Sequence, residues 1–396
     1  MKILIVELDC RGHHFILYLN KLICMFLKKK YQIFLLTTKS SAKSQAFKIL
    51  KKKYLDELKV FLIKDIYLDN NKNFVNKFYF QFKYFFLLFN NITKLNFKYK
   101  FTKIYFNHFD PFFYAYAILG FFLSASKISG LLLNIKFHQY FFGFKKKTIL
   151  DNLKLLLFKL FLKNKKVENV FIIDTLFKNF LVKKKIFNKK IIHVNEAVNK
   201  IYYINKRFCK KKLSINKVGK CILIYGAISK RKGVMELLKA LSVNLDKNIF
   251  VIIAGKFDNY FLNEVTLYLR MNNFLKKKVI VINKFISLKE ENYLFNICDY
   301  VWLGYNNFSS DSSSGVLQLS VVAQKPVIAS NRGLISFIVR KNKIGLLFND
   351  KKYSDYNRIL KSISISKKYF FKKNLNIYKK KIILNNFEKQ ISNAMQ

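Results

Sequence analysis

Two successive series of short apolar segments, rich in Val, Ile and Leu, restrict the fold of this chain more than any other feature of its sequence. Within each segment the apolar residues are consecutive, which is typical of parallel strands that are buried on both faces. Segments with a helical spacing of apolar residues separate them. The predicted strands are Lys2–Leu8, Gln32–Thr37, Lys59–Ile63, Lys103–Asn107, Gly130–Ile135, Asn169–Ile173, Lys190–Val194, Cys221–Tyr225, Ile249–Ala254, Val279–Ile282, Tyr300–Leu303, Pro326–Ala329 and Gly345–Phe348.

So many strands, and a length of 396 residues, exceed what one ordinary domain holds. We therefore predict an α/β protein with two doubly wound, Rossmann-like domains that face a cleft. The first domain is expected over residues 1–195 and the second over residues 196–372. Residues 373–396 have helical spacing, and we expect them to form a helix that crosses back to the first domain.

The chain carries 74 Lys and Arg residues against 22 Asp and Glu residues, a formal net charge of +52. Such a charge favours polyanionic partners, namely nucleic acid, anionic lipid or a phosphorylated substrate. Codon composition explains much of it more simply, because the abundant Lys, Asn, Ile, Phe and Tyr have A/T-rich codons, whereas Gly, Pro and Trp are rare. A basic run is therefore weak support for any particular partner.

Cysteine usage and the apolar stretches indicate where the protein resides. Five scattered cysteines, none in a Cys-x-x-Cys pair, fit a reducing cytoplasm and neither a disulfide framework nor a zinc site. Glu7 and Asp9 interrupt the first apolar segment, so we expect no signal peptide. The longest apolar stretch, Phe112–Ala125, is shorter than the roughly 20 residues of a spanning helix, and we predict a buried or interfacial helix there.

Three loops that follow predicted strands contain residues suited to ligand binding, since parallel α/β sheets bind ligands beyond the carboxyl ends of their strands. The first, Asp9–His14, contains Gly12, which allows the backbone to approach a ligand closely, and His13. Its alternative interpretation is a tight turn with solvated histidines. His108 and His138 also end or follow predicted strands, and we expect both to face the cleft.

The second loop, Tyr225–Gly233, places Arg231 and Lys232 directly before a helical segment. Cations beside a helix N-terminus suit a diphosphate, because their charges and the helix amides act together. The alternative is an ordinary Lys-rich turn. Most other basic runs, however, lack a preceding strand and the Gly-x-x-Ser sequence that begins here at Gly226.

The third loop, Asn306–Val316, contains five serines around Asp311. Hydroxyls and free amides at a helix start, here Ser313, Ser314 and Gly315, suit phosphate oxygens, and a carboxylate suits sugar hydroxyls. A purely structural N-cap is the alternative, but five serines exceed what a cap requires.

These loops in their order resemble a large family of retaining glycosyltransferases with the GT-B fold, called group 1 and similar to family 4. In the second domain of that family, a strand is followed by the motif Gly-Arg-x-x-x-x-Lys-Gly and then by a helix. Further along the chain comes an acidic Glu-x7-Glu segment, which ends in Gly-x-Pro-Val-Ile-Ala-Ser. Gly12-His13 and His193–Val198 are similar to the family's N-domain loop and domain-crossing segment. The resemblance is strongest in Tyr225–Leu238, Cys298–Tyr305, Ser313–Leu317 and Lys325–Ser330.

Two departures from the family pattern concern charged positions. Ala227 stands where the family has Arg, and Arg231, about one turn later, would substitute for it. Leu319 stands at the second Glu of the acidic pair, whereas Asp311 keeps a carboxylate at the first. The contacts of that second Glu are therefore in doubt.

The resemblance implies a metal-independent transfer of a sugar, hexosyltransferase-like, from a UDP- or GDP-sugar with retention at the anomeric carbon and without a cofactor. Arg231 and Lys232, with the amides of Ser313–Gly315, would stabilise the charge that develops on the leaving phosphate. Asp311 would bind ribose or sugar hydroxyls. The resemblance also implies that the first domain, residues 1–195, binds the acceptor and that the second, residues 196–372, binds the nucleotide sugar. The sequence contains no Asp-x-Asp motif and no His/Cys cluster, in agreement with a metal-free site.

The histidines are candidates for a smaller role in this reaction. Retaining members of the family need no dedicated general base, because the donor phosphate can accept the proton of the acceptor. We therefore treat His138 and His13 as candidate catalytic residues that position substrate, with a purely structural role as the alternative, and place His108 after them.

The acceptor is expected to be a glycan or a lipid-linked molecule, as in bacterial relatives that build cell-envelope polysaccharide. The basic and aromatic segment Asn71–Tyr105, followed by Phe112–Ala125, would then dock on anionic lipid at the inner face of the plasma membrane. The protein would be cytoplasmic or peripheral on that membrane. Half-buried, half-solvated helices are the alternative for these segments.

Two other classes of protein compete with an enzyme. The charge and the aromatic content fit an RNA-binding protein, but no recognisable module is present and the strands are expected to be buried, so we expect no nucleic acid partner. Ala227 and Leu319 fit a non-catalytic GT-B-like scaffold. Donor binding and donor hydrolysis separate the scaffold from an enzyme.

Overall fold

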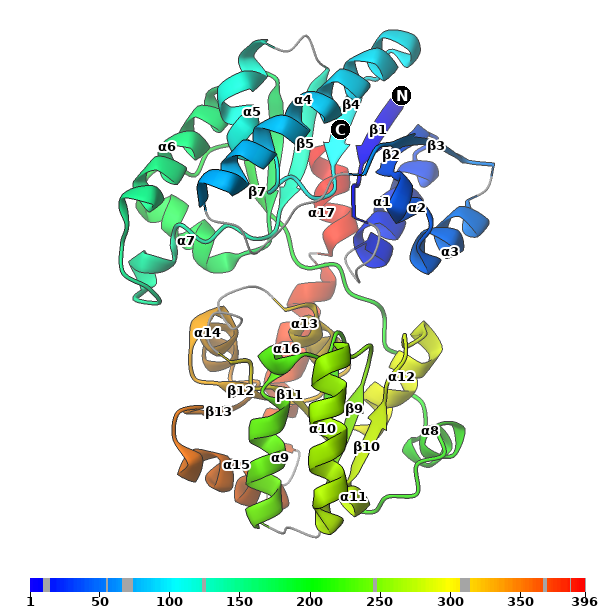
Figure 1. Cartoon of the computed structure of the whole chain (residues 1–396), viewed down its shortest axis with the longest axis vertical. Coiled ribbons are helices and arrows are strands. Elements are labelled where there is room, and N and C mark those ends of the chain that lie inside the picture. The colour runs from blue at the N-terminus through cyan, green and yellow to red at the C-terminus, as the bar shows by residue number, and fades with distance from the viewer. Residues whose placement is uncertain are drawn as a thin grey trace. The chain divides into compact units, whose positions relative to one another are not determined.

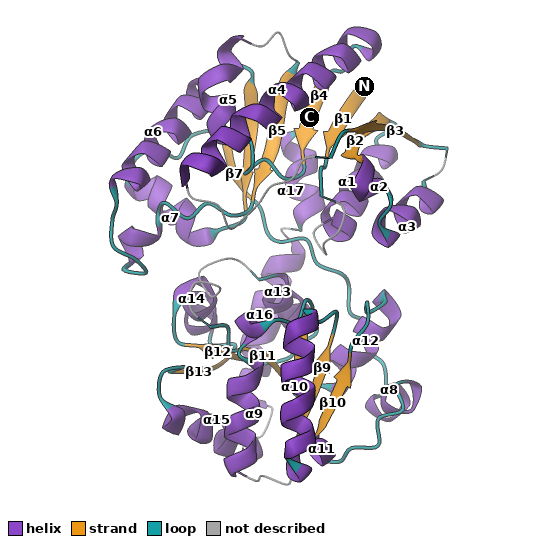
Figure 2. Cartoon of the chain, viewed as in Figure 1, coloured by secondary structure: helices purple, strands orange, loops and turns teal. Residues whose placement is uncertain are grey.

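The computed structural model describes residues 1–9, 15–54, 56–65, 74–122, 126–244, 248–306, 314–365, 369–384 and 386–395. The chain divides into two compact units (Figure 1): unit 1 comprises Met1–Ala197 and Asn385–Gln396, and unit 2 comprises Val198–Leu384. Each unit is a parallel sheet covered by helices (Figure 2). The prediction of an α/β protein with two Rossmann-like domains is therefore confirmed.

The described part of unit 1 contains a sheet of seven parallel strands in the order β3-β2-β1-β4-β5-β6-β7. From β1 the chain builds outward to β3 and then crosses to β4, on the other side of β1. The strand order therefore reverses between β1 and β4, which in such sheets is the usual place for a ligand. The strands are β1 (Lys2–Val6), β2 (Gln32–Thr38), β3 (Leu58–Ile63), β4 (Lys103–Phe106), β5 (Lys127–Leu132), β6 (Val167–Ile172) and β7 (Ile191–His193).

Helices cover both faces of this sheet because successive strand residues point to opposite sides. Leu4 and Val6 of β1 pack into one apolar core, whereas Ile3 and Ile5 pack into another. The first core is covered by α4 (Phe74–Tyr99), α5 (Phe113–Leu119), α6 (Ile149–Lys163) and α7 (Thr175–Lys183), and the second by α1 (Asn20–Lys28), α3 (Gln45–Lys53) and α17 (Phe387–Ala394).

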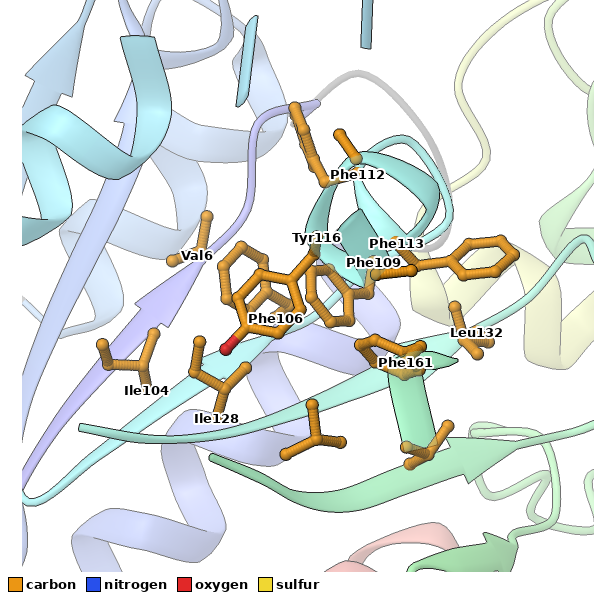
Figure 3. Close-up of a cluster of buried hydrophobic side chains, with 14 of the residues drawn as sticks. Val6, Ile104, Phe106, Phe109, Phe112, Phe113, Tyr116, Ile128, Leu132 and Phe161 are labelled. Carbon is orange, nitrogen blue, oxygen red and sulfur yellow. The ribbon is translucent and has the colours of Figure 1, made fainter. Parts of the chain in front are cut away.

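Aromatic side chains fill the first core and anchor the loop after β4 (Figure 3). The rings of Phe106 and Phe109 have centroids 4.3 Å apart, and Phe109 lies 5.3 Å from Phe161. Burial of a Phe side chain stabilises a fold by roughly 1.5–3 kcal/mol. Phe109 therefore holds in place the loop that carries Asn107, His108 and Asp110.

The described part of unit 2 contains six parallel strands in the order β10-β9-β8-β11-β12-β13. Here the strand order reverses between β8 and β11. The strands are β8 (Lys220–Tyr225), β9 (Ile249–Ala254), β10 (Val279–Ile282), β11 (Tyr300–Leu303), β12 (Val327–Ser330) and β13 (Gly345–Phe348). The helices are α8 (Lys206–Lys212), α9 (Val234–Asn244), α10 (Asn259–Met271), α11 (Asn273–Lys278), α12 (Leu288–Ile297), α13 (Gly315–Val322), α14 (Gly333–Asn342), α15 (Tyr353–Ile365) and α16 (Tyr369–Leu384).

Each strand predicted from the sequence overlaps a strand of the structure, and the largest shift is at β5, which was expected over Gly130–Ile135. The amides of Leu133 and Asn134 donate to the Asp110 carboxylate, at 2.8 and 2.7 Å, and not to a neighbouring strand. The strand therefore ends earlier than its apolar residues indicate. It begins earlier as well, at Lys127, because Lys127, Ile128 and Ser129 pair in register with β4.

The C-terminal segment forms two helices in place of the single one expected over 373–396. Helix α16 ends at Leu384 within unit 2, whereas Phe387 and Ile391 of α17 are buried in unit 1. Asn386 accepts a hydrogen bond from the Lys389 amide and so caps the start of α17, which accounts for the break.

The described parts of the two segments expected at a membrane are largely helical. Within Asn71–Tyr105, Phe74–Tyr99 forms α4 and residues 103–105 belong to β4, and part of Phe112–Ala125 forms α5 with a 3₁₀ helix at Gly120–Phe122. Among the helices that the structure describes, none is long and apolar enough to cross a membrane.

Candidate functional site

Glycines bring the loops at the carboxyl ends of β8, β9 and β11 into close backbone contact. Gly255 has φ +144°, and a Cβ atom there would lie 1.8 Å from the Gly226 carbonyl oxygen. Gly233 has φ +63°, and its Cβ would lie 2.1 Å from the carbonyl oxygen of Gly304. Only glycine fits positions of this kind without strain. The sequence therefore fixes the path of the loop that carries Arg231 and Lys232.

Lys232 ends a 3₁₀ helix, Lys230–Lys232, directly before α9, and only 3% of its surface is exposed. Its Nζ donates to the Tyr225 carbonyl oxygen at 2.6 Å and lies 3.4 Å from the Tyr305 hydroxyl. Burial, with a smaller contribution from Arg231, lowers the pKa of Lys232 below its usual range. No salt bridge with a carboxylate is found for Lys232 among the described residues. A buried ammonium without such a partner is costly, so this group is suited to an anionic ligand.

Tyr305, in the loop after β11, lies against both cations. The Lys232 Nζ and the Arg231 Cζ are each 5.1 Å from the centre of its ring. Burial by itself raises the pKa of the Tyr305 phenol, but the charges of Lys232 and Arg231 and the hydrogen bonds of Lys232 and Ser314 lower it overall. The aromatic ring thus orients two positive charges at the point where the strand order reverses.

Backbone and side-chain hydrogen bonds join the two loops of this reversal point. The Asn306 amide donates to the Arg231 carbonyl oxygen at 2.9 Å, and the Trp302 indole donates to the Lys232 carbonyl oxygen at 3.0 Å. The Asn306 side chain also donates to Glu236 at 2.8 Å. The cations are therefore held on a rigid support rather than on a free turn.

The N-terminus of α13 adds amides to the same group of residues. Ser314 caps this helix by accepting from the Leu317 amide, and its hydroxyl lies 3.4 Å from the Tyr305 hydroxyl. Gly315 is the first residue of the helix. Of the predicted phosphate-binding residues, Arg231, Lys232 and Ser314 thus come together, with Gly315 adjacent to Ser314 in the chain.

Other predicted residues of this site have different outcomes. Asp311 and Ser313 lie outside the described residues. Leu319 is 6% exposed and belongs to the interior of unit 2, so no charge could replace it there at low cost. Gln318 beside it is also buried, and among the described residues its Oε1 has no hydrogen-bond partner.

His138, the first of the candidate catalytic residues, follows β5 in unit 1 and is 1% exposed. Its Nε2 lies 3.1 Å from the Asp174 carboxylate, and rings of Phe177 and Phe180 surround it. Its Nδ1 is buried and finds no partner among the residues that the structure describes. Gly12 and His13 lie outside the described residues.

The reversal point of unit 1, between β1 and β4, carries a polar cluster that the sequence analysis only touched through His108. The Asn107 amide donates to the Glu7 carboxylate at 2.5 Å, and the Asp9 backbone amide donates to its other oxygen at 3.0 Å. His108 Nε2 lies 3.2 Å from the Asp110 carboxylate. Glu7 directly follows β1 and Asp110 lies in the loop after β4, and two acids so placed in a chain poor in acids are the signal that could have selected this cluster.

Charge pairing shifts the ionisation of this cluster. Burial raises the pKa of Glu7, and the nearby His108, Asn107 and Asp9 amide only partly oppose it. Burial lowers the pKa of His108, but the hydrogen bond and charge of Asp110 and the charges of Glu7 and Asp9 raise it overall. Burial raises the pKa of Asp110, and His108 with two backbone amides lowers it overall. Among the described residues, no group of three or more His, Cys, Asp and Glu side chains could hold a metal ion.

Comparison with known proteins defines the class to which these features belong. Residues 205–381, slightly under half of the chain, match the family model of glycosyl transferases group 1. Comparison with curated protein sequences finds no match. The match covers most of unit 2, including both loops that hold Lys232 and Tyr305.

Solved structures extend the likeness to the whole chain. A glycosyltransferase from Rickettsia africae has 15% identity, with 99% of this chain and 96% of that chain covered and a TM-score of 0.66. Anabaena HepE in complex with UDP-glucose has 16% identity, 100% and 99% coverage and a TM-score of 0.68. WaaG, described as a glycosyltransferase involved in lipopolysaccharide biosynthesis, has 11% identity, 98% coverage of both chains and a TM-score of 0.62.

These structures share the fold of this chain. Together with the match of unit 2 to glycosyl transferases group 1, they support a glycosyltransferase of the GT-B fold.

Proposed function

We propose that the protein transfers a sugar from a UDP- or GDP-sugar to an acceptor, with retention of configuration at the anomeric carbon and without a metal ion. The buried ammonium of Lys232 at the β8/β11 reversal point carries this proposal. A diphosphate is the ligand that suits such a cation next to Arg231 and the amides at the N-terminus of α13. The complex of Anabaena HepE with UDP-glucose supports a nucleotide-sugar donor.

Charge stabilisation on the leaving group is the proposed source of catalysis. As the glycosidic bond of the donor breaks, negative charge accumulates on the diphosphate. Lys232, Arg231 and the amides of Ser313, Ser314 and Gly315 would stabilise that charge. Because Lys232 is buried and fixed by Tyr225, little reorganisation accompanies the reaction.

Asp311, His138 and His13 complete the proposed site. Asp311 would accept hydrogen bonds from donor hydroxyls, as its place in the sequence pattern suggests. His138 and His13 would position substrate. The aromatic rings around His138 favour a positioning role for that residue.

Calorimetric titration with a panel of nucleoside diphosphates and nucleotide sugars, paired with an assay of donor hydrolysis, tests this proposal. We expect micromolar binding of UDP or GDP and slow release of the sugar from the bound donor. Binding without hydrolysis or transfer would favour a non-catalytic scaffold. Absence of any binding at millimolar nucleotide would contradict the proposed activity.

The acceptor is proposed to be a lipid-linked precursor of a bacterial cell-envelope glycan, reached at the inner face of the plasma membrane. The likeness to WaaG, described as involved in lipopolysaccharide biosynthesis, is in keeping with this acceptor class. The exposed face of α4, α5 and α6 supports membrane docking. Tyr79, Phe86 and Phe97 of α4 are 61–88% exposed, and Ile149 of α6 is 87% exposed.

The charges of this face also support membrane docking. Helices α4, α5 and α6 contain a single carboxylate in total, Asp151, which is buried and paired with Lys145. Lys83, Lys94 and Lys98 are exposed on α4 among the aromatic side chains. Exposed apolar residues and cations without exposed acids suit a surface of anionic lipid.

Flotation with anionic and with neutral vesicles tests membrane docking. We expect binding to anionic vesicles that high salt releases only in part, because salt screens the lysines and not the apolar contacts. The double variant Phe86→Ser/Phe97→Ser should lose most of the binding, whereas the control Tyr260→Ser/Met271→Ser, which alters exposed apolar residues of α10, should retain it. Equal recovery with both vesicle types would remove support for this surface.

A further inference from the structure

The β1/β4 reversal point of unit 1 holds a second group of functional side chains, opposite in charge to the site of unit 2. Val6 and Phe106 are paired at the ends of β1 and β4, so Glu7 and Asn107 are the next residues on two adjacent strands. The chain has only 22 Asp and Glu residues in 396, yet Glu7, Asp9 and Asp110 fall in these two loops. A composition that favours Lys does not produce such a cluster.

The cluster is preorganised from several directions. Both Glu7 oxygens accept hydrogen bonds, from the Asn107 side chain and from the Asp9 amide. The adjacent Leu8 carbonyl oxygen accepts from the hydroxyls of Thr38 and Ser41, at 3.1 and 2.8 Å. The first of the two loops is therefore tied to the end of β2 and to the short helix α2 (Lys39–Ala42) that follows it.

His108 is held in the same way and remains accessible. Asp110, which accepts from two backbone amides after β5, lies 3.2 Å from the imidazole Nε2 and holds the ring by charge when His108 is protonated. The second ring nitrogen, Nδ1, is not used by Asp110, and 34% of the His108 side chain is exposed. The imidazole can therefore offer one fixed hydrogen-bonding atom to a ligand.

Asn107 supplies an independent sign that a ligand binds here. The residue is 2% exposed and its Nδ2 is bound to Glu7, but among the described residues no donor reaches its Oδ1. A buried amide oxygen is normally hydrogen-bonded, and a ligand hydroxyl is one group that could satisfy it.

The chemistry of these side chains defines the ligand. Carboxylates and an imidazole bind hydroxyl groups well, and three carboxylates repel a phosphate or a carboxylate. A metal ion is a poorer fit, because no three of the described His, Cys, Asp and Glu side chains converge on one point. The cluster thus suits a neutral, polyhydroxyl group.

We propose that His108, oriented by Asp110 and flanked by Glu7 and Asn107, binds hydroxyl groups of a neutral sugar at the reacting end of the acceptor. This inference rests on the proposed glycosyltransferase function and adds the acceptor's chemical class. His108 and Glu7 contact the sugar, and Asp110 is a positioning residue. Any lipid or anionic part of the acceptor lies outside this cluster.

Ligand-observed NMR and calorimetry with a panel of neutral methyl hexosides and the corresponding methyl hexuronides test the proposal. In each pair only the C6 group differs, a hydroxymethyl or a carboxylate. We expect at least one hexoside to bind the wild-type protein about tenfold more tightly than its hexuronide, because the carboxylate is repelled. Glu7→Gln should narrow that difference, and His108→Gln should weaken hexoside binding about tenfold.

Controls separate this inference from the function on which it rests. Glu168→Gln neutralises a carboxylate near the start of β6 and should change neither the hexoside affinity nor its difference from the hexuronide affinity. Asp110→Asn should weaken hexoside binding less than Asp110→Ala. UDP affinity should be the same in all these variants. Equal binding of hexosides and hexuronides, or no hexoside binding while UDP binds, would overturn the inference. A protein that binds hexosides but no nucleotide would instead contradict the proposed donor site.

Discussion

The reversal point of unit 1 carries Glu7, His108 and Asp110 on the loops after β1 and β4, whereas that of unit 2 carries Arg231 and Lys232 after β8. Both lie where the order of the parallel strands reverses, so topology alone assigns them equal potential to bind a ligand. Their charges differ because two short loops differ. The scaffold therefore determines where a ligand binds, and the loop residues determine which ligand it is.

The same comparison separates charged residues that the Lys-rich composition explains from charged residues that it does not explain. A general excess of lysine predicts exposed lysines on solvated turns, as at Lys230, whose side chain is 74% exposed and paired with Glu264. Lys232, two residues later, is buried against Tyr305. Glu7, Asp9 and Asp110 of unit 1 belong to residue types that are rare in this chain, so its composition does not explain them.

The strongest test of the unit 2 architecture is a glycine substitution. Gly255→Ala would place a methyl group against the Gly226 carbonyl oxygen at a backbone angle unsuited to alanine. We expect a loss of about 3 kcal/mol or more in the free energy of unfolding, measured by denaturant titration. Gly143→Ala, with φ +74° and open space around it, should lose about 1 kcal/mol. Equal losses would show that the close backbone contact contributes little.

Removal of the buried cation should come next in size. Lys232→Ala should weaken UDP binding about 10- to 100-fold, the range expected for loss of a charge-assisted hydrogen bond with a phosphate. The control Lys230→Ala removes an exposed cation of the same turn and should change the affinity less than about twofold. Similar effects of the two variants would mean that net charge, not the buried site, holds the nucleotide.

A smaller effect is expected at Glu291, a buried carboxylate of α12. It accepts from the Tyr225 hydroxyl at 2.6 Å and from the Asn199 amide at 2.9 Å, and the Tyr225 carbonyl oxygen in turn accepts from Lys232. Glu291→Ala should therefore weaken UDP binding about fivefold, whereas Glu291→Gln, which keeps an acceptor, should weaken it less. Glu264→Ala is the matched surface control. An unchanged affinity in Glu291→Ala would show that Tyr225 needs no such support.

The smallest expected effect is the uptake of a fraction of a proton when UDP binds. Burial lowers the pKa of Lys232 in the folded protein, so the charged side chain reduces the free energy of unfolding below that pKa. This loss becomes smaller as the pH rises through the folded pKa, and it vanishes above the unfolded pKa of about 10.4. A bound diphosphate favours the charged form and raises this pKa again. Calorimetry in alkaline buffers of different ionisation enthalpy should therefore reveal proton uptake on UDP binding, absent in Lys232→Ala. Proton release in the wild type would contradict this sign.

Much of the fold follows from local sequence patterns. Strands buried on both faces leave continuous apolar runs, which is why β9, β10, β11 and β13 were predicted with the bounds that the structure has. At β5 the pattern failed, because a carboxylate from the preceding loop takes the amides that the apolar run would have paired. Periodicity carries no information about such a contact.

The candidate site was predicted only in part for the same reason. Arg231 and Lys232 follow from a strand, a glycine turn and a helix, all local. The contact of Lys232 with Tyr305 joins loops 73 residues apart, and that of Glu7 with Asn107 joins loops 100 residues apart. Neither pairing follows from a local pattern of residues, even though the acids near the ends of β1 and β4 mark the positions involved in the second one. The roles predicted for Asp311, His13 and Ser313 stay predictions, as those residues are outside the described part of the chain.

A crystal structure of the full chain with UDP tests the central claim most directly, namely that the two reversal points bind ligands of opposite character. The account predicts a diphosphate at the β8/β11 reversal point of unit 2, with a phosphate oxygen about 3 Å from Lys232 Nζ. The Glu7 and His108 cluster of unit 1 should contain no phosphate. A nucleotide bound at the β1/β4 reversal point, or none bound at saturating UDP, would contradict the account.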